Sequence, residues 1–372
     1  MLTELQRHPH ARSVLAPALN DGRPSHAYLF HGPGGAGKRA VARALAAELL
    51  CEGAADPVGA RARVVSGAHL DLTWVMPSGA HEMLVADVDQ PVIAAASKTP
   101  FESRRRVFVI ERVDELGDEA ANRMLKTLEQ PASFVHLLLL TDRLGEVLPT
   151  IRSRCQLVRF EPPNPEDVAA GIEARGVDPE TARACVGLGL QDADQAAELA
   201  SPDGRTLRAA AEAFARAAVA GRMVDDRPWQ TLLTAVRARG SSVADELQAR
   251  AEAELELTSR RDRTWVKNEW AERGRRGRRR AQTAALDLGL QIVSLWFADL
   301  AATAWGAEDL IRNQDRRAEL RQDAAADAAA TPGRLRAAIE LVEETRLRLS
   351  FNVTEELACE ALGYRLERAL GA

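Results

Sequence analysis

The glycine-rich stretch Gly32–Arg39 places the strongest constraint on the fold of this chain. Its sequence, Gly-Pro-Gly-Gly-Ala-Gly-Lys-Arg, meets the phosphate-loop pattern G-x-x-x-x-G-K-[ST] at every specified position except the last. In that pattern the glycines let backbone N–H groups surround phosphates, the lysine reaches the outer phosphates, and the final hydroxyl binds Mg²⁺. Arg39 has no hydroxyl and repels a metal ion. The sequence therefore predicts a nucleotide-binding type of loop that is altered at its metal ligand.

The segments on either side of this loop have the structure that it requires. Ala27–Phe30 is an apolar run typical of a buried strand. After the loop, apolar residues recur every four positions, at Val41, Leu45 and Leu49, as on one face of a helix. A strand, a glycine turn and a helix in this order favour a phosphate loop over an ordinary turn with a surface lysine. We predict four residues as nucleotide contacts: Gly32, Gly35, Gly37 and Lys38.

Bulk composition limits the classes of protein that remain. The chain has 372 residues, of which 46% are hydrophobic, and this length predicts two or three folded domains. A net charge of −5 argues against a globally basic nucleic-acid-binding protein but leaves room for a local basic patch. We see no 18-residue apolar run and no signal-peptide pattern over Met1–Asn20, so we expect a cytoplasmic protein that binds no membrane.

Cysteine and histidine spacing indicates no metal site. The four cysteines form no C-x-x-C pair, and the seven histidines show no metal-binding spacing. His8 and His10 lie beside a predicted surface helix at the start of the chain. We expect reduced, mostly buried thiols, with Cys155 packed in the core.

Strand-like and helix-like patterns alternate in the first 160 residues, and every pattern after them is helix-like. The alternation predicts a parallel sheet with helices on both faces, whose strands are 27–31, 107–110, 136–141 and 156–160. The Ala-, Gly- and Arg-rich residues 52–66 are expected to form an irregular loop. The proline-dense segment Glu161–Pro165 predicts a domain boundary, and Asp225–Pro228 predicts a second hinge.

A basic run lies far from the phosphate loop. Residues 260–280 hold ten Lys or Arg against three acids, a local charge of +7. Such a run is typical of a solvated helix face, and a phosphate-contacting surface is the alternative. Trp265 and Trp270 are expected to pack against neighbouring helices rather than to stack on bases.

A second predicted strand, 107–110, ends where a P-loop ATPase places an acidic pair. The aspartate of that pair holds Mg²⁺ and the glutamate polarises the attacking water. Here the aligned residues are Glu111 and Arg112, and a guanidinium cannot act as a base. Asp114 and Glu115 are a competing alignment three residues beyond the strand, which would leave ATP hydrolysis open.

Four short motifs occur in the order His26–Phe30, Gly32–Arg39, Leu125–Glu129 and Ser153–Cys155. In this order they resemble the clamp-loader branch of the AAA+ ATPases, and within it the delta-prime subunits of the bacterial DNA polymerase III clamp loader. The resemblance extends over nearly the whole chain, since Leu349–Val353 and the leucines after it are similar to the family's closing collar helices. It implies an α/β AAA+ P-loop domain at 1–162, a helical lid at 163–224 and an all-α C-terminal collar at 225–372.

The resemblance implies a role for two further residues. In the family, the arginine of the Ser-Arg-Cys motif points across a subunit interface to a neighbour's ATP and stabilises charge on the γ-phosphate. Arg154 is thus expected to be an arginine finger supplied in trans, and an ordinary salt-bridged surface arginine is the alternative. Thr141, at the end of a predicted strand, is expected to be sensor-like.

The chain departs from the family's ATP-hydrolysing subunits at four positions. Arg39 replaces Ser or Thr, Glu111 replaces Asp, Arg112 replaces Glu, and Gln195 replaces an arginine of the lid. These changes predict a subunit without intrinsic ATPase activity, while Lys38 leaves binding of ATP or ADP open. Of the family's four-cysteine zinc module only Cys51 is present, so we predict no zinc.

The resemblance implies work in DNA replication as part of the DNA polymerase III holoenzyme, a DNA-directed DNA polymerase and nucleotidyltransferase complex. The expected partners are gamma/tau and delta subunits and, through the complex, the beta sliding clamp and primed DNA. Two alternatives remain. One is a gamma/tau-like motor that hydrolyses ATP, and the other is a separate DNA-binding protein that uses residues 260–280.

Overall fold

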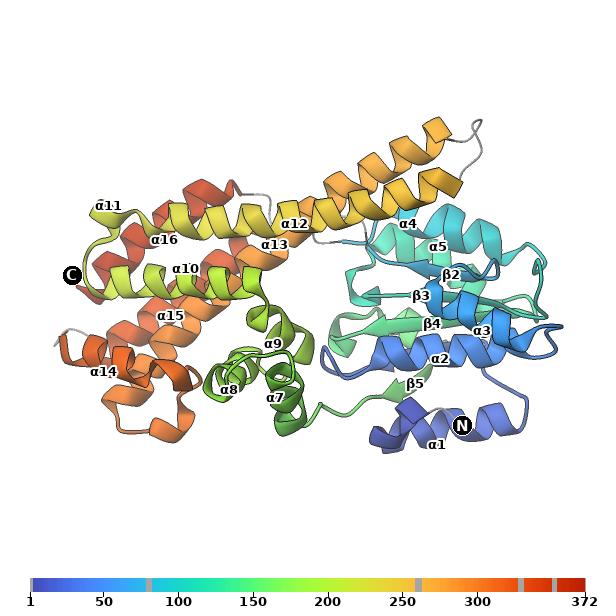
Figure 1. Ribbon diagram of the computed structural model, residues 1–372, viewed down its shortest axis with the longest axis horizontal. Helices are drawn as coiled ribbons and strands as arrows, with labels where there is room; N and C mark the ends of the chain where they lie inside the picture. The colour runs from blue at the N-terminus through green and yellow to red at the C-terminus, as the bar shows by residue number, and fades with distance from the viewer. Residues whose placement is uncertain (1–2, 78–81, 258–262, 327–330, 350–352, 372) are drawn as a thin grey trace. The chain divides into compact units, whose positions relative to one another are not determined.

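The chain divides into two compact units, Met1–Pro163 and Asn164–Ala372 (Figure 1). The computed structural model describes residues 3–77, 82–257, 263–326, 331–349 and 353–371. The predicted lid and collar segments both belong to the second unit. The three-domain division therefore stays a prediction.

The first unit contains the predicted parallel sheet. In the described residues it has five strands in the order β2-β3-β4-β1-β5, and every neighbouring pair is parallel. The strands are β1 Ala27–His31, β2 Leu72–Val75, β3 Arg106–Ile110, β4 Val135–Thr141 and β5 Gln156–Arg159. Four of them match the predicted strands to within one residue at each end. The short edge strand β2 was not predicted.

Helices cover both faces of this sheet because successive strand residues point to opposite sides. Tyr28 and Phe30 pack with α1, α2 and α3 in one core cluster, whereas Ala27 and Leu29 pack with α4, α5 and α6 in another. The helices are α1 Pro9–Asn20, α2 Lys38–Cys51, α3 Pro57–Ser66, α4 Val85–Val88, α5 Asp118–Glu129 and α6 Pro149–Arg152. A π-helical turn, Asp89–Ala94, follows α4. The predicted α/β fold class is confirmed.

The irregular loop expected over residues 52–66 is wrong, because most of it is helix α3. The Asp56 carboxylate accepts a hydrogen bond from the Gly59 N–H at 3.0 Å, and Pro57 occupies the first turn. Gly67 ends the helix with a φ of 79°, a conformation that glycine adopts without strain. These start and stop signals outweigh the high content of glycine and arginine.

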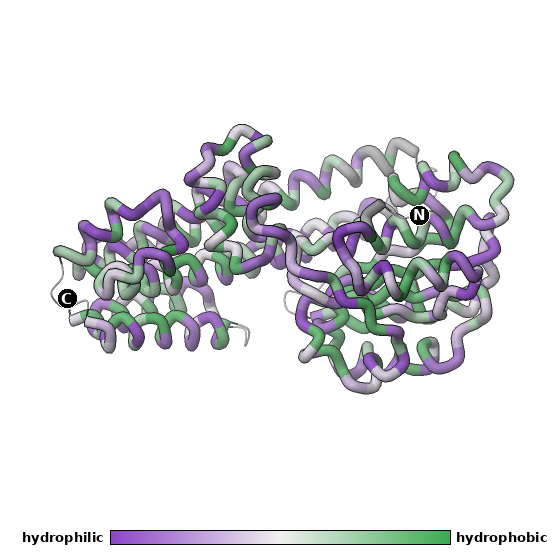
Figure 2. The backbone as a smooth tube through the Cα atoms, turned by 90° about the horizontal axis from the view of Figure 1, so that it is seen from below, coloured by the Kyte–Doolittle hydropathy of each residue, from purple (hydrophilic) through white to green (hydrophobic). Residues whose placement is uncertain are grey.

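The second unit is helical throughout its described residues, as predicted. Its helices are α7 Pro165–Glu173, α8 Pro179–Leu188, α9 Ala193–Ala200, α10 Pro202–Val219, α11 Met223–Asp226, α12 Pro228–Leu257, α13 Arg263–Ala304, α14 Arg317–Ala326, α15 Pro332–Leu349 and α16 Glu355–Leu370. One large apolar cluster joins them, centred on the buried Trp296 and Phe297. Along these helices the tube in Figure 2 alternates between green and purple, as expected for helices that bury one side.

Helix α13 contains an apolar segment that the sequence analysis did not anticipate. Trp270–Ala304 is long and apolar enough to cross a membrane, with a mean hydropathy of 1.4 in its most apolar window. However, 78% of that window is buried in the fold. This burial is typical of the central helix of a helical bundle.

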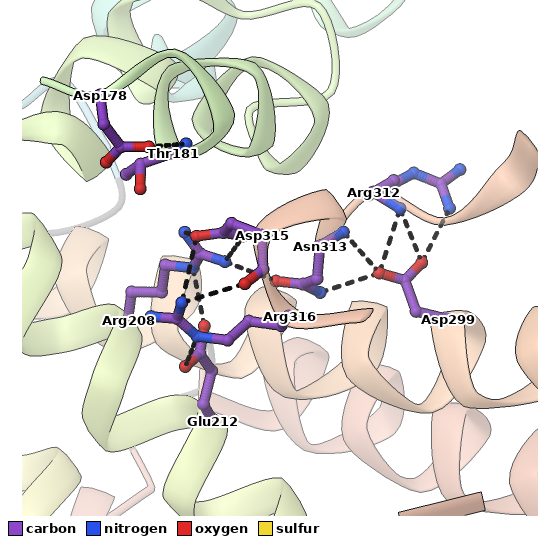
Figure 3. A network of polar contacts seen from close by, with 9 residues as sticks. All are labelled: Asp178, Thr181, Arg208, Glu212, Asp299, Arg312, Asn313, Asp315 and Arg316. Carbon is purple, nitrogen blue, oxygen red and sulfur yellow. Dashed lines mark hydrogen bonds and ion pairs between the residues drawn. The ribbon is translucent and has the colours of Figure 1, made fainter. Parts of the chain in front are cut away.

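A buried polar network ties the connection between α13 and α14 to the rest of the second unit (Figure 3). The fully buried Asp299 carboxylate accepts hydrogen bonds from the backbone N–H groups of Arg312 and Asn313 at 3.1 and 2.8 Å. Arg208 on α10 binds Asp315 through two nitrogens at 2.9 and 2.6 Å, and its Nε lies 2.7 Å from Glu212. These contacts compensate charges that would be costly to bury alone.

Candidate functional site

The phosphate loop lies between the end of β1 and the first residue of α2, at the carboxyl edge of the sheet where ligands of open α/β folds bind. Gly32 has a φ of 144°, and a Cβ there would lie 2.4 Å from the carbonyl oxygen of Phe160. Gly35 and Gly37 have φ values of 69° and 82°. The three predicted glycines are therefore the residues at which the loop needs a glycine backbone.

Lys38 is buried and directed back into its own loop. Its ammonium donates to the carbonyl oxygens of Gly32 and Pro33 at 2.6 and 2.5 Å and pairs with Asp142 at 2.8 Å. A lysine ammonium has three hydrogens, and three acceptors of the chain lie in reach of them. A nucleotide phosphate would have to displace at least one of these acceptors. Asp142 directly follows β4, and its role was not predicted.

Arg39 forms an ion pair with Glu111, and the sequence analysis aligned these two residues with the Mg²⁺ ligands of a P-loop ATPase. The Arg39 Nε lies 2.7 Å from Glu111 Oε2, and the Trp74 Nε1–H donates to Glu111 Oε1 at 2.7 Å. The Glu111 side chain is 5% exposed. A guanidinium thus neutralises the carboxylate in a setting where the family pattern has a metal ion. Both carboxylate oxygens are engaged by the chain itself.

The competing acidic pair, Asp114 and Glu115, is also engaged. The Thr141 hydroxyl donates to Asp114 Oδ1 at 2.7 Å, and Arg143 pairs with the same carboxylate at 3.1 Å. Arg112 adopts a left-handed conformation with a φ of 53° and pairs with Glu115 at 2.8 Å. Thr141, predicted to be sensor-like, thus binds an acid that the sequence analysis considered as a possible catalytic group.

Arg154 lies just after α6 and is bound by Glu129, the last residue of α5. Its Nε and Nη2 donate to Glu129 Oε1 at 2.9 and 2.5 Å, and its Nη1 donates to the Thr150 carbonyl at 2.8 Å. The Arg154 side chain is 33% exposed. The structure thus joins two of the recognised motifs, Leu125–Glu129 and Ser153–Cys155, through one ion pair. Their spacing in the sequence did not predict this contact.

His8 lies directly before α1, as predicted, but the burial of its side chain was not predicted. It is 8% exposed, and its ring packs against Phe160 with centroids 4.9 Å apart. A Cβ at Gly37 would lie 3.6 Å from His8 Nε2. Burial lowers the pKa of His8, against the opposing effect of Glu161. His8 therefore contributes a neutral, aromatic surface beside the phosphate loop.

Neither the cysteines nor the acids in the described ranges form an evident metal site. Among the residues that the structure describes, no group of three or more His, Cys, Asp or Glu side chains is placed to hold a metal ion. Burial raises the pKa of Cys155 to about 12, and its side chain packs against the core as expected. Cys51 ends α2, where its thiol lies 3.4 Å from the Pro57 carbonyl. The absence of zinc stays a prediction.

The basic run is partly balanced by charges of the same unit. Within its described part, Glu272 pairs with both Arg275 and Arg276, and Arg279 pairs with Glu355 at 2.7 Å. Residues 260–262 and the side chain of Trp265 lie outside the described part. The ion pairs favour the solvated helix face over the phosphate-contacting surface.

Gln195, aligned with the family's lid arginine, lies on α9. Its Oε1 accepts a hydrogen bond from Gln291 Nε2 at 3.4 Å, within the second unit. A neutral amide at this position carries no charge that would interact with a phosphate. The alignment of Gln195 with the lid arginine remains a prediction.

The first unit matches a known family model. The model described as "DNA polymerase III, delta subunit" matches residues 7–164. The chain is 34% identical to a DNA polymerase III subunit delta' from Bacillus subtilis over 54% of this chain and 61% of that protein. It is 35% identical to subunit delta' from Pseudomonas aeruginosa over 35% of this chain and 42% of that protein. A gamma/tau subunit from Mycobacterium bovis is 33% identical over 39% of this chain and 26% of that protein.

These matches confirm the resemblance that the four motifs indicated. The chain spans less than two thirds of the length of each of these curated relatives. The matched segment 7–164 contains the parallel sheet, the altered phosphate loop and Arg154. Over this segment the chain is similar to the DNA polymerase III delta-subunit family and to the curated delta' subunits of that polymerase.

Proposed function

We propose that this chain is a clamp-loader subunit that supports ATP hydrolysis by its neighbours without hydrolysing ATP itself. It would assemble with gamma/tau and delta subunits, help to place the beta sliding clamp on primed DNA, and supply Arg154 to a neighbour's ATP. This role implies that the protein is located in the cytoplasm.

The Arg39–Glu111 ion pair carries this proposal. Hydrolysis in P-loop enzymes depends on a Mg²⁺ ion that neutralises developing charge on the phosphates. Arg39 removes the hydroxyl ligand, and its guanidinium, 2.7 Å from Glu111, satisfies the acid that would be the second metal contact. In addition, Arg112 stands in place of the water-polarising glutamate. Three parts of one catalytic centre are thus changed together.

The chain could bind a nucleotide even if it does not hydrolyse one. The glycine backbone and Lys38 are retained, so the loop can hold phosphates once Lys38 leaves Asp142 or a loop carbonyl. Because Arg39 takes the place of the metal ligand, we expect any ADP or ATP affinity to be independent of Mg²⁺. Titration of a fluorescent ADP analogue with Mg²⁺ and with EDTA measures this directly, and a strong Mg²⁺ requirement would contradict the assigned role of Arg39.

Hydrolysis by the purified chain and by a reconstituted loader tests the main proposal. The purified chain should show no Mg²⁺-dependent ATP turnover above a Lys38→Ala control. In a loader with clamp and primed DNA, Arg154→Ala should abolish turnover at the one site it serves, since a trans arginine contributes about 10³–10⁵ in rate. Arg123→Ala is the matched control, because Arg123 is also bound by acids of its own chain.

A gamma/tau-like motor is the second candidate, and retention of Lys38 favours it. Motor activity would use Asp114 or Glu115, which would have to be released from Thr141 and Arg112. Turnover by the purified chain that disappears in Lys38→Ala and in Asp114→Asn would establish the motor. Loss of loader activity in Arg154→Ala together with full activity in Lys38→Ala would exclude it.

A further inference from the structure

The contact between Arg154 and Glu129 limits what Arg154 offers to another molecule. Four hydrogen bonds of Arg154 involve all three nitrogens of the guanidinium. Nε and Nη2 form the edge that faces Glu129, while Nη1 faces Thr150 and Ser153. An arginine contacts phosphate best through two parallel N–H donors. The Nε–Nη2 edge, which suits such a contact, is occupied by a carboxylate.

Glu129 stands where helix physics disfavours an acid. It is the last residue of α5, and the carboxyl end of a helix carries partial negative charge. The Arg154 guanidinium compensates that repulsion. An acid at the carboxyl end of a helix that is compensated by one specific arginine indicates that Glu129 serves a purpose other than the stability of α5.

The pair is accessible enough to exchange. The side chains of Arg154 and Glu129 are 33% and 45% exposed, so water reaches both. An ion pair with this exposure is weak enough to open without unfolding the unit. A nucleotide phosphate is a multivalent anion with acceptors of the same geometry, and it can replace the carboxylate on the Nε–Nη2 edge.

We propose that Glu129 is a positioning residue that holds Arg154 withdrawn in the free subunit and yields it to the phosphate of a neighbouring subunit. The inference rests on the proposed role of Arg154 as a trans finger. Glu129 would suppress futile hydrolysis before clamp and DNA bring the subunits into their productive arrangement. Release costs only the exchange of one anionic acceptor for another.

A reconstituted loader containing Glu129→Gln tests this inference. Glutamine keeps the shape of the side chain but removes the charge that strengthens the contact. The rate of ATP hydrolysis without clamp and DNA should rise by about 1.4- to 5-fold, the factor expected for an exposed ion pair. Glu119→Gln removes a charge from the same helix without touching Arg154 and should leave that rate unchanged.

The double variant Glu129→Gln with Arg154→Ala gives a result that a merely structural role would not produce. If Glu129 acts through Arg154, the rise seen with Glu129→Gln disappears in the double variant, which then equals Arg154→Ala. A fall in rate with Glu129→Gln, or no change, would overturn the inference. If Arg154→Ala alone has no effect, the proposed finger function fails, and the role given to Glu129 fails with it.

The free chain gives an independent measurement. Hydrogen exchange at the Arg154 Nε–H, followed by NMR with the signal assigned by Arg154→Lys, should be faster in Glu129→Gln than in the unaltered chain. Equal exchange would show that Glu129 does not hold the guanidinium, whatever the loader does. This result is separate from the proposed function, because it involves no partner and no ATP.

Discussion

Replacement of Arg208 by methionine tests the contribution of the buried polar network in the second unit. Arg208 is 4% exposed, and its partners Asp315 and Glu212 have side chains that are 6% and 10% exposed. Methionine fills similar space but removes the buried guanidinium from both carboxylates, which keep only the longer contacts with Arg316 at 3.2 and 3.4 Å. Removal of one partner from a buried pair costs about 3–5 kcal/mol, and the half-exposed Arg316 compensates only part of the charge that remains.

This cost can be expressed as a shift in melting temperature. For a unit of this size, 1 kcal/mol corresponds to about 2–4 °C, so Arg208→Met should lower the midpoint by about 6–20 °C. Thermal and urea unfolding followed by tryptophan fluorescence would measure the shift, since Trp229 and Trp296 are buried in this unit. Arg336→Met is the control, because the Arg336 side chain is 81% exposed and its pair with Glu340 contributes about 0.3–0.5 kcal/mol.

Two results would refute the reasoning. If Arg208→Met is within about 1 kcal/mol of the Arg336→Met control, the buried pair contributes no more than an exposed one. If additional replacement of Asp315 and Glu212 by leucine destabilises the protein further, the loss does not come from stranded charge. Partial recovery in that triple variant is the expected outcome.

Three further predictions concern the first unit and the thiols. Burial lowers the pKa of His136 from its ordinary 6.5. Below about pH 6.5 the unfolded chain therefore binds a proton that the folded chain does not. The free energy of unfolding should accordingly fall as the pH is lowered from 7.5 to 5. A midpoint that rises on acidification would contradict this. Gly32→Ala should destabilise the first unit by at least about 1–3 kcal/mol, since it adds backbone strain to a clash with Phe160, and an unchanged melting curve would refute it. Burial raises the pKa values of Cys155 and Cys359 to about 12, so both thiols should react with iodoacetamide at pH 8 only after unfolding. Labelling of the folded chain, measured by mass spectrometry, would argue against the burial of Cys359 and against the raised pKa of the partly buried Cys155.

The fold was largely predictable because its strongest signals are local. Apolar runs bounded by turn residues located four strands, and the glycine loop set the order of strand, turn and helix. Strand β2 was missed because Leu72–Val75 is only four residues long, which is too short for an alternation of apolar and polar residues to be recognised. Helix α3 was missed because the loop was predicted from the high content of Ala, Gly and Arg. Asp56, Pro57 and Gly67 are start and stop signals that would have predicted the helix.

The candidate site was predictable in its residues and not in its pairings. The three glycines and Lys38 follow from a pattern with a known backbone purpose. The acids that bind the cations do not, because Asp142, Glu111 and Glu129 each reach their partner only through the tertiary arrangement of separate elements. The sequence predicted Glu111 to be an altered metal ligand but gave no sign that Arg39 itself would neutralise it.

The Arg39–Glu111 pair has a consequence for how this loop can change over generations. Each residue makes the other tolerable, so the two positions are no longer independent. Replacement of Arg39 by serine would remove the cation that pairs with Glu111, whose side chain is 5% exposed, and leave it the Trp74 N–H. Replacement of Glu111 by alanine would leave the Arg39 guanidinium beside the loop without this carboxylate. A metal-binding site at these two positions would therefore require coordinated substitution of both residues through a less stable intermediate, so the pair itself hinders the gain of such a site.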